Sequence, residues 1–303
     1  MRWKKAGVVV PAPPPLAWAR SHAALPVPRS LSQGETELYF STRDERGRSY
    51  VAKAVFAAGK DLTDPEYSPV PVLEPGQLGS FDDAGVTTSC LVEDGGRLYL
   101  YYSGWTRGVS VPFYFFVGCA TSDDDGTSFA RASLSPILER HAVDPYLTAS
   151  PWVIVEDGVW RMWYVSGTGW APTEETPVHH YHIKYAESRD GLSWQRDGVV
   201  CIDYRDEFEY AIARPCVVFD GGRYRMWFSS RGEAYRLGYA ESLDGLSWDR
   251  RDDEAGLDPS PSGWDSEMVA YPVVFDRGGI RHMLYNGNGY GATGIGLALA
   301  VDG

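Results

Sequence analysis

Residues 3–9 read WKKAGVV and residues 194–200 read WQRDGVV, so the start of the chain repeats a frame from its middle. The shared frame is Trp, two basic or polar residues, any residue, Gly and two valines. The last residues, GIGLALAVDG (294–303), resemble the strand that precedes this frame elsewhere and stop where the frame should begin. We therefore expect the N-terminal strand to complete the last repeat, because pairing the two chain ends closes a ring and removes its open edge.

The repeat itself is an apolar run, an acidic turn with glycine, and an alternating aromatic run that ends in Ser, Asn or Gly. Four segments show it: SCLVEDGGRLYLYYSG (89–104), SPWVIVEDGVWRMWYVSG (150–167), RPCVVFDGGRYRMWFSSRG (214–232) and YPVVFDRGGIRHMLYNGNG (271–289). A more diverged copy is VPRSLSQGETELYFSTRD (27–44). Turns of this type between β-rich runs predict hairpins, and the repeat recurs about every 60 residues.

A second motif follows the aromatic run in three of the repeats. It reads CATSDDDGTSF (119–129), YAESRDGLSW (185–194) and YAESLDGLSW (239–248). It predicts a third strand, a tight turn and a fourth strand. The turn resembles the Asp-box of sialidases with one residue fewer, and we interpret it as a folding device in which Asp and Ser close the turn onto the backbone. The sequence thus predicts an all-β fold: a single five-bladed β-propeller domain over residues 1–303, with four-stranded antiparallel blades.

The composition narrows the classes of partner. The chain has 303 residues, and 44% of them are hydrophobic, which is enough for a large core. The formal net charge of −13 argues against a nucleic-acid partner, although a local arginine cluster could hold one phosphate or carboxylate. No apolar stretch is long enough to span a membrane, and the start of the chain lacks the apolar core of a signal peptide.

The cysteines point to a reducing compartment. They lie in apolar strand-like runs without CxxC spacing, at Cys90, Cys119, Cys201 and Cys216. Buried reduced thiols fit this pattern better than disulfides or metal ligands, so we expect a cytoplasmic protein.

Propeller topology predicts which face carries the chemistry. The starts of the inner strands and the loops between second and third strands share one face and surround the central hole, and this rim is rich in polar residues. We expect the substrate-binding residues there: His22, Arg43, Asp44, Asp82, Trp105, Ser150, Trp170, His182, Arg214, Arg231, Tyr271, Asn286 and Asn288. Aromatic faces suit the C–H surface of a sugar, and acids and amides suit its hydroxyls. The alternative is that the acids pair with rim arginines and only tie the blades together.

The repeats and rim carboxylates resemble the five-bladed propeller glycosidases, which include the arabinanase/xylosidase, invertase, levansucrase and mannoside-phosphorylase families. The segments STRDE, FDDAGV, SGTGW, WDSEMVAYP and NGNG look more closely like uncharacterised propeller proteins of bacterial sugar and polysaccharide gene clusters. The resemblance implies catalysis by a carboxylic acid and a second carboxylate acting as base or nucleophile. The chain departs from the arabinanase and invertase pattern in the first blade, where His22 stands without a carboxylate.

The favoured hypothesis is a glycosidase-like hydrolase that cleaves a glycosidic bond of a small sugar conjugate in the axial cavity. Asp83, Glu209 and Glu267 are the expected catalytic carboxylates, with Glu267 or Glu209 as proton donor and Asp83 as base or nucleophile. Two alternatives stay open: a glycoside phosphorylase or glycosyl transferase on the same scaffold, and a non-catalytic sugar-binding propeller. The arginines also leave a nucleotide-sugar or other glycosyl phosphate open as the substrate.

No cofactor and no metal site is expected. In HHYH (179–182) only alternate histidines share one side of a strand, and two ligands do not make a zinc site. The glycine-rich NGNGYG (286–291) lacks the lysine and the strand-to-helix context of a phosphate-binding loop.

Overall fold

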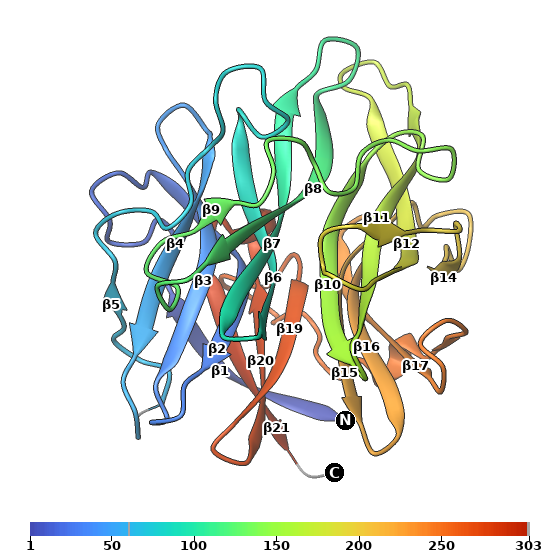
Figure 1. Cartoon of the computed structure of the whole chain (residues 1–303). Helices are drawn as coiled ribbons and strands as arrows, with labels where there is room; N and C mark the ends of the chain where they lie inside the picture. The colour runs from blue at the N-terminus through green and yellow to red at the C-terminus, as the bar shows by residue number, and fades with distance from the viewer. Residues whose placement is uncertain (60, 302–303) are drawn as a thin grey trace.

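The computed structural model describes residues 1–59 and 61–301, and almost all of its regular structure is β-strand (Figure 1). Antiparallel pairing divides the strands into five groups, called blades below. Blade 1 is β2 (Ser21–Ser30), β3 (Thr36–Arg43), β4 (Ser49–Phe56) and β5 (Glu66–Tyr67). Blade 2 is β6 (Gly85–Asp94), β7 (Arg97–Arg107), β8 (Phe113–Ser122) and β9 (Ala130–Arg131). Blade 3 is β10 (Thr148–Glu156), β11 (Val159–Ala171) and β12 (Val178–Ser188), with β13 (Trp194–Gln195) and β14 (Val200–Ile202) both on β12.

Blade 4 is β15 (Ala211–Asp220), β16 (Arg223–Arg231), β17 (Tyr235–Ser242) and β18 (Asp249–Arg250). Blade 5 is β19 (Ala270–Arg277), β20 (Ile280–Asn286), β21 (Ile295–Val301) and, from the other end of the chain, β1 (Arg2–Val10). The short helices η1 (Asp252–Glu254) and α1 (Asn288–Gly291) lie in connections. The all-β propeller predicted from the sequence is confirmed.

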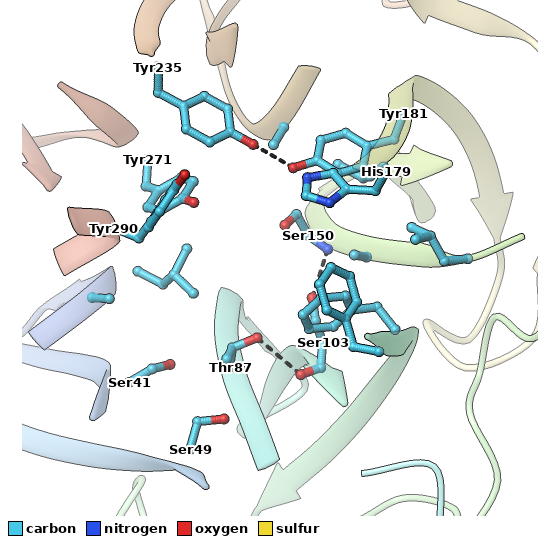
Figure 2. Close-up of a pocket in the computed structure, with 18 of the residues that line it drawn as sticks. Ser41, Ser49, Thr87, Ser103, Ser150, His179, Tyr181, Tyr235, Tyr271 and Tyr290 are labelled. Atoms are coloured by element: carbon cyan, nitrogen blue, oxygen red, sulfur yellow. Dashed lines mark hydrogen bonds between the residues drawn. The ribbon is translucent and has the colours of Figure 1, made fainter. Parts of the chain in front are cut away.

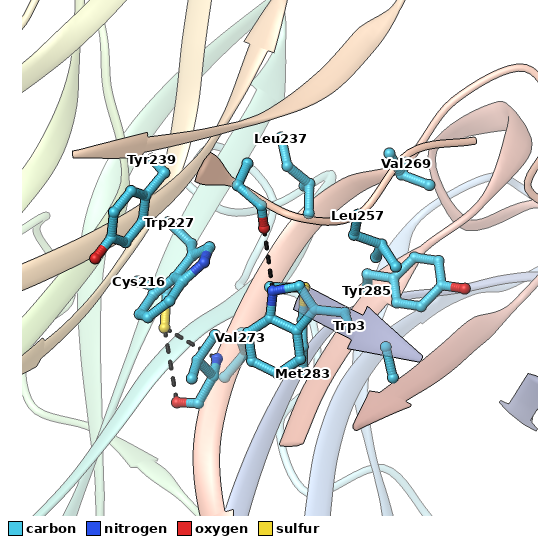
Figure 3. Packing of buried hydrophobic residues seen from close by; sticks show 13 residues of the cluster. Trp3, Cys216, Trp227, Leu237, Tyr239, Leu257, Val269, Val273, Met283 and Tyr285 are labelled. Atoms are coloured by element: carbon cyan, nitrogen blue, oxygen red, sulfur yellow. Dashed lines mark hydrogen bonds between the residues drawn. The ribbon is translucent and has the colours of Figure 1, made fainter. Parts of the chain in front are cut away.

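The N-terminal strand closes blade 5, as the repeated Trp frame predicts. β1 pairs antiparallel with β21 from Arg2 opposite Val301 to Val10 opposite Ile295. Trp3 is only 8% exposed, and its indole Nε1 donates to the carbonyl of Ala255 at 3.0 Å (Figure 3). The first strand is therefore part of the core as well as of the sheet.

Each inner strand is interrupted by a register shift in its first half. In four blades the residue at this point precedes proline and has a positive φ, which is uncommon for a residue other than glycine. These residues are Leu25 (57°), Ser150 (45°), Arg214 (55°) and Tyr271 (57°). The bulges turn these residues out of the strand's regular alternation.

Neighbouring blades are joined at these bulges by the Ser and Asn residues that end the aromatic runs. The Ser150 N–H donates to Ser103 Oγ at 2.8 Å, and the Tyr271 N–H donates to Ser229 Oγ at 2.7 Å. At the ring closure, Asn286 Oδ1 accepts from the backbone N–H of Leu25 in blade 1 at 2.9 Å. The repeated polar residue is thus a joint between blades.

The S-x-D-G-x-S-W turns are the folding devices expected from the sequence. In blade 3, Asp190 Oδ1 accepts from the backbone N–H groups of Leu192 and Ser193, and Ser188 Oγ accepts from the Gly191 N–H. The hydrogen bonds that Asp190 accepts, led by the one from Ser193, lower its pKa to about 2. The Asp190 carboxylate is therefore ionised, and backbone N–H groups of the turn already donate to it.

The four cysteines are buried and free, as expected. Burial raises the pKa of Cys90 to about 11, so its thiol stays protonated and unreactive at neutral pH. Among residues 1–59 and 61–301, no helix combines the length and apolar character that crossing a membrane requires.

Candidate functional site in the axial cavity

All five blades contribute residues to one cavity of about 380 Å³. We call it the axial cavity, because the inner strands converge on it. Its lining comprises His22, Ala24, Leu25, Ser41, Arg43, Ser49, Thr87, Ser103, Phe113, Phe115, Leu147, Ala149, Ser150, Val165, His179, Tyr181, Ala213, Arg231, Tyr235, Tyr271 and Tyr290. The cavity therefore combines aromatic rings, small hydroxyls and a few cations.

One side of the cavity is built from tyrosines (Figure 2). The hydroxyls of Tyr181 and Tyr235 meet at 2.5 Å, and the rings of Tyr271 and Tyr290 stand beside them. Burial raises the pKa of Tyr235 and of Tyr271 well above the usual value for a phenol. These phenols are therefore neutral at physiological pH and act as hydrogen-bonding groups on apolar ring faces.

The opposite side carries small hydroxyls from blades 1 and 2, including Ser41, Ser49 and Thr87 (Figure 2). Thr87 Oγ1 donates to the Ser103 carbonyl at 3.1 Å, and Ser49 Oγ accepts from Trp105 Nε1 at 2.7 Å. A hydroxyl held in this way still has a free lone pair or proton for a ligand.

Positive charge dominates the lining. Arg43 and Arg231 are its two guanidiniums, and none of the described residues that line the cavity is a carboxylate. Desolvation, and then the charge of Arg43, lowers the pKa of His22 to about 4. Desolvation, with Arg231 as the second cause, lowers the pKa of His179 to about 4. Both imidazoles are neutral at pH 7, so the arginines carry the charge.

Five of the residues predicted from the sequence line this cavity: His22, Arg43, Ser150, Arg231 and Tyr271. Two predicted tryptophans lie directly behind the lining. Trp105 holds Ser49 by the hydrogen bond described above, and the Trp170 ring centroid is 5.3 Å from that of Phe113. Both tryptophans support lining residues.

The buried rim acids have a different role. In each of blades 2 to 5, a buried carboxylate precedes the inner strand, and these carboxylates are at most 6% exposed. Each one pairs with a cation that lies on the outer strand of the blade or directly after it. The pairs, called blade tethers below, are Asp82 with Arg131 (2.7 Å), Asp144 with Arg196 (3.1 Å), Glu209 with Arg250 (2.6 Å) and Asp265 with Lys5 (2.6 Å). In three tethers a second-strand tyrosine also donates to the carboxylate: Tyr102, Tyr164 and Tyr285.

The tethers change the interpretation of two predicted site residues, Asp82 and Glu209. Neither lines the axial cavity. Glu209 borders a separate polar hollow of about 410 Å³, where it also accepts a hydrogen bond from the Ser230 hydroxyl. Burial would raise the pKa of Glu209, but the hydrogen bonds from Arg250 and Ser230 outweigh it and lower the pKa. An ionised carboxylate of this kind is a poor proton donor.

Asp83 and Glu267, the other two predicted catalytic acids, also lie outside the lining. Asp83 accepts from the Gly79 N–H at 2.9 Å, while Glu267 is exposed and its backbone N–H donates to Asn288 Oδ1. Neither forms an ion pair with another described residue. The structure therefore does not gather the three predicted acids around the axial cavity, because one is tethered and two remain in rim loops.

The remaining predicted substrate-binding residues make structural contacts. Asp44 pairs with Arg48 within a hairpin turn, and His182 Nδ1 lies 3.1 Å from Asp203. Asn286 joins blades 5 and 1. Arg214 is 1% exposed and crosses the axis from blade 4, donating to backbone carbonyls and to a serine of blades 1 and 2. Asn288 closes the loop of Glu267.

Sequence reasoning missed several lining residues at the starts of third strands, notably His179, Tyr181 and Tyr235. It chose His182 in β12, the neighbour of Tyr181, whose side chain points to the opposite face of the strand. A shift of one residue along a strand reverses the face that a side chain occupies. His179 and Tyr181, two residues apart, stack with ring centroids 4.7 Å apart, and both face the cavity.

Among the residues described, no group of three or more His, Cys, Asp or Glu side chains is placed to hold a metal ion. Neutral hydroxyls and two cations suit a polar organic ligand or an anion. The cavity therefore offers stacking, hydrogen bonding and positive charge as its chemical means.

Solved structures share this architecture. A complex of BT0996 with RGII superposes with a TM-score of 0.77 at 18% identity, over 98% of this protein and 91% of the other. A "Glycoside hydrolase" gives 0.74 at 17% identity, over 97% and 93%. A structure described as "The GH130 family of mannoside phosphorylases contains glycoside hydrolases that target beta-1,2 mannosidic linkages in Candida mannan" gives 0.71 at 16% identity, over 94% and 85%. At such identities the likeness shows the fold, that of the propeller glycoside hydrolases.

Sequence relatives show the family. No family model matches the chain. "Uncharacterized protein MT1551" of Mycobacterium tuberculosis (strain CDC 1551 / Oshkosh) is 44% identical, and "Uncharacterized protein Rv1502" of strain ATCC 25618 / H37Rv is 43% identical. Each match covers 99% of this chain and 99% of the relative. The chain belongs to the family of these two mycobacterial proteins.

Proposed function

We propose that this protein binds a small carbohydrate in the axial cavity and acts on its glycosidic bond. The observation that carries the proposal is the lining itself, in which tyrosine rings face a row of small hydroxyls across one cavity. Ring faces suit the C–H surfaces of a sugar, and the hydroxyls suit its polar edge. A volume of about 380 Å³ is at the small end for ligand pockets and fits one or two sugar rings.

Hydrolysis of the usual kind needs two carboxyl groups about 5–9.5 Å apart on either side of the bond. Asp83 and Glu267 are the predicted catalytic acids that stay free of ion pairs with other described residues. Both lie in loops just before inner strands, β6 and β19, so a substrate that projects from the cavity would meet them at the rim. We propose Glu267 as proton donor and Asp83 as base or nucleophile.

Phosphorolysis is the second candidate. It is favoured by the two arginines and by the absence of a carboxylate among the described lining residues. Phosphate would attack the sugar in place of water, so the protein would need only a proton donor, and the arginines would orient the phosphate.

The test is a screen of nitrophenyl glycosides and disaccharides with and without inorganic phosphate. On a substrate that is turned over, Glu267→Gln and Asp83→Asn should each lower kcat by about 100-fold or more. Asp157→Asn removes an exposed acid from the turn between β10 and β11, at the opposite end of the inner strand from the rim, and serves as the matched control. Turnover that needs added phosphate would select phosphorolysis. Unchanged turnover in both rim variants would overturn the assigned roles, and binding without any turnover would overturn the enzymatic proposal.

A further inference from the structure

The arginines of the axial cavity have no anionic partner in the described part of the chain. The protein carries a net charge of −13, and most of its buried acids are held by a cation. Yet Arg43 and Arg231 form no ion pair, and neither side chain donates a hydrogen bond to another described residue. Each guanidinium has five N–H groups, so both keep their full donor capacity for something in the cavity.

Arg231 is held so that only its edge is free. Its guanidinium carbon lies 5.4 Å from the ring centroid of Tyr210 and 5.5 Å from those of Tyr235 and Tyr290. Aromatic rings stack on the faces of a guanidinium and leave its planar N–H edge for hydrogen bonding. Its Nε atom is buried without a partner among the described residues. The edge is therefore fixed in place and unsatisfied.

Arg43 reaches the same cavity from blade 1. Its side chain is exposed but lines the cavity, where desolvation by the surrounding protein lowers its pKa. Arg43, Arg231 and Tyr271 line the same cavity. Burial, then Tyr235 and Tyr290, raise the pKa of Tyr271, and both arginines act in the opposite direction. The two cations thus act on one region of the cavity.

A third cation lies beneath the lining. Arg214 is fully buried between the blades, and its hydrogen bonds go to Thr88, Ser89 and Pro26 and to no carboxylate of the described chain. Desolvation lowers its pKa to about 10, so it remains charged at neutral pH. Uncompensated buried charge is unfavourable, and an anion in the cavity would offset that cost for Arg214 and for the partly buried Arg231.

We propose that the axial cavity is an oxyanion site, in which Arg43 and Arg231 hold a phosphate or carboxylate group beside the bound sugar. This inference rests on the proposed carbohydrate function and specifies its substrate class as an anionic one. Two guanidinium edges make charge-assisted hydrogen bonds to such a group, and Ser150 and the neutral His22 supply further polar contacts. The oxyanion comes either from the sugar, as a sugar phosphate or uronate, or from free inorganic phosphate.

The experiment is calorimetric titration of the full chain with four probes: inorganic phosphate, glucose 1-phosphate, glucuronate and glucose. We expect at least one anionic probe to bind, and to bind at least about tenfold more weakly to Arg43→Gln and to Arg231→Gln. Arg231→Lys keeps the charge but loses the planar fork, and it should fall between the wild type and Arg231→Gln. Arg97→Gln, which removes a surface partner of Asp123, is the matched control and should bind as the wild type does.

The four probes show where the oxyanion comes from, and the variants show whether the arginines bind it. Binding of phosphate alone points to a co-substrate, while binding of glucose 1-phosphate or glucuronate without phosphate points to the sugar's own group. Affinities unchanged in correctly folded arginine variants, or no binding of any anion, would overturn the inference. Glucose binding that is the same in wild type and arginine variants would leave the proposed function standing without the anion.

Discussion

The Lys5 ammonium lies 2.6 Å from the carboxylate of Asp265, which joins the first strand to the loop before β19. Lys5 stands two residues after Trp3, as Arg196 does after Trp194, and both cations hold the buried acid of their blade. The basic position of the repeated Trp frame therefore has a physical purpose. It fixes the outer strand of a blade to the start of its inner strand.

Replacing Lys5 should destabilise the protein through the charge that it leaves behind. In Lys5→Met the Asp265 side chain, 1% exposed, loses its cation. Breaking a buried pair costs about 3 kcal/mol, and the partial exposure of Lys5 places the expected loss at or below that figure. Urea unfolding at pH 7 measures it, with the exposed neighbour Lys4→Met as the control. Equal unfolding midpoints for the two variants would contradict the tether.

The tether of Glu209 predicts a pH dependence. Burial raises the pKa of Glu209, but Arg250 and Ser230 lower it further, so the net folded pKa lies below the unfolded value. A depressed carboxyl pKa gives stability that is present above the unfolded pKa and is lost as the pH falls through the folded one. The stability difference between wild type and Glu209→Gln should therefore be largest near neutral pH and shrink below about pH 4. A difference that stays constant in denaturant melts across this range would count against the depressed pKa.

Trp3 should contribute core stability beyond its place in the sheet. Its ring packs edge-on against Trp227 with centroids 6.1 Å apart (Figure 3). Trp3→Ala should cost about 3–5 kcal/mol of unfolding free energy, as truncation of a buried Trp typically does. Val8→Ala, in the same strand but 42% exposed, should cost about 0.5 kcal/mol or less. Thermal or urea unfolding of the two variants measures both costs, and similar losses would mean that β1 is held by strand pairing alone.

The joint between blades 2 and 3 links stability to the cavity. Ser103→Ala removes the acceptor of the Ser150 N–H and leaves that donor without its partner, at a cost of about 1–3 kcal/mol. Because Ser150 lines the cavity, ligand affinity should fall as well. Thermal unfolding and titration with the tightest probe measure both effects, with the exposed Ser110→Ala as the control. Loss of stability with unchanged affinity would show that the hydrogen bond between the blades does not affect ligand binding.

The sequence predicted the fold because its repeat encodes local chemistry, such as the Asp190 turn and the Trp3 frame. It predicted the site less completely. Buried acids such as Glu209 and Asp82 lie at the expected rim, but their partners Arg250 and Arg131 come from outer strands. Only the folded blade brings these pairs together, so a carboxylate before an inner strand could not be assigned to a tether or a cavity from spacing.

The cavity tyrosines escaped prediction for a related reason. Tyr181 lies in the third strand of its blade, and Tyr235 begins the third strand of the next. Which residues of such a strand face the cavity depends on where its pairing with the second strand starts. The positive φ of Tyr271 turns this side chain out of the regular alternation of its strand. Such irregularities are set by the packing of five blades around one axis, and strand periodicity does not reveal them.

The most direct test of the carbohydrate site is a crystal structure of the protein soaked with the sugar probe that binds most tightly. We predict density for the sugar in the axial cavity, in contact with Tyr271 and with Arg231. Density in the polar hollow beside Glu209, with the axial cavity containing only solvent, would contradict the proposed site.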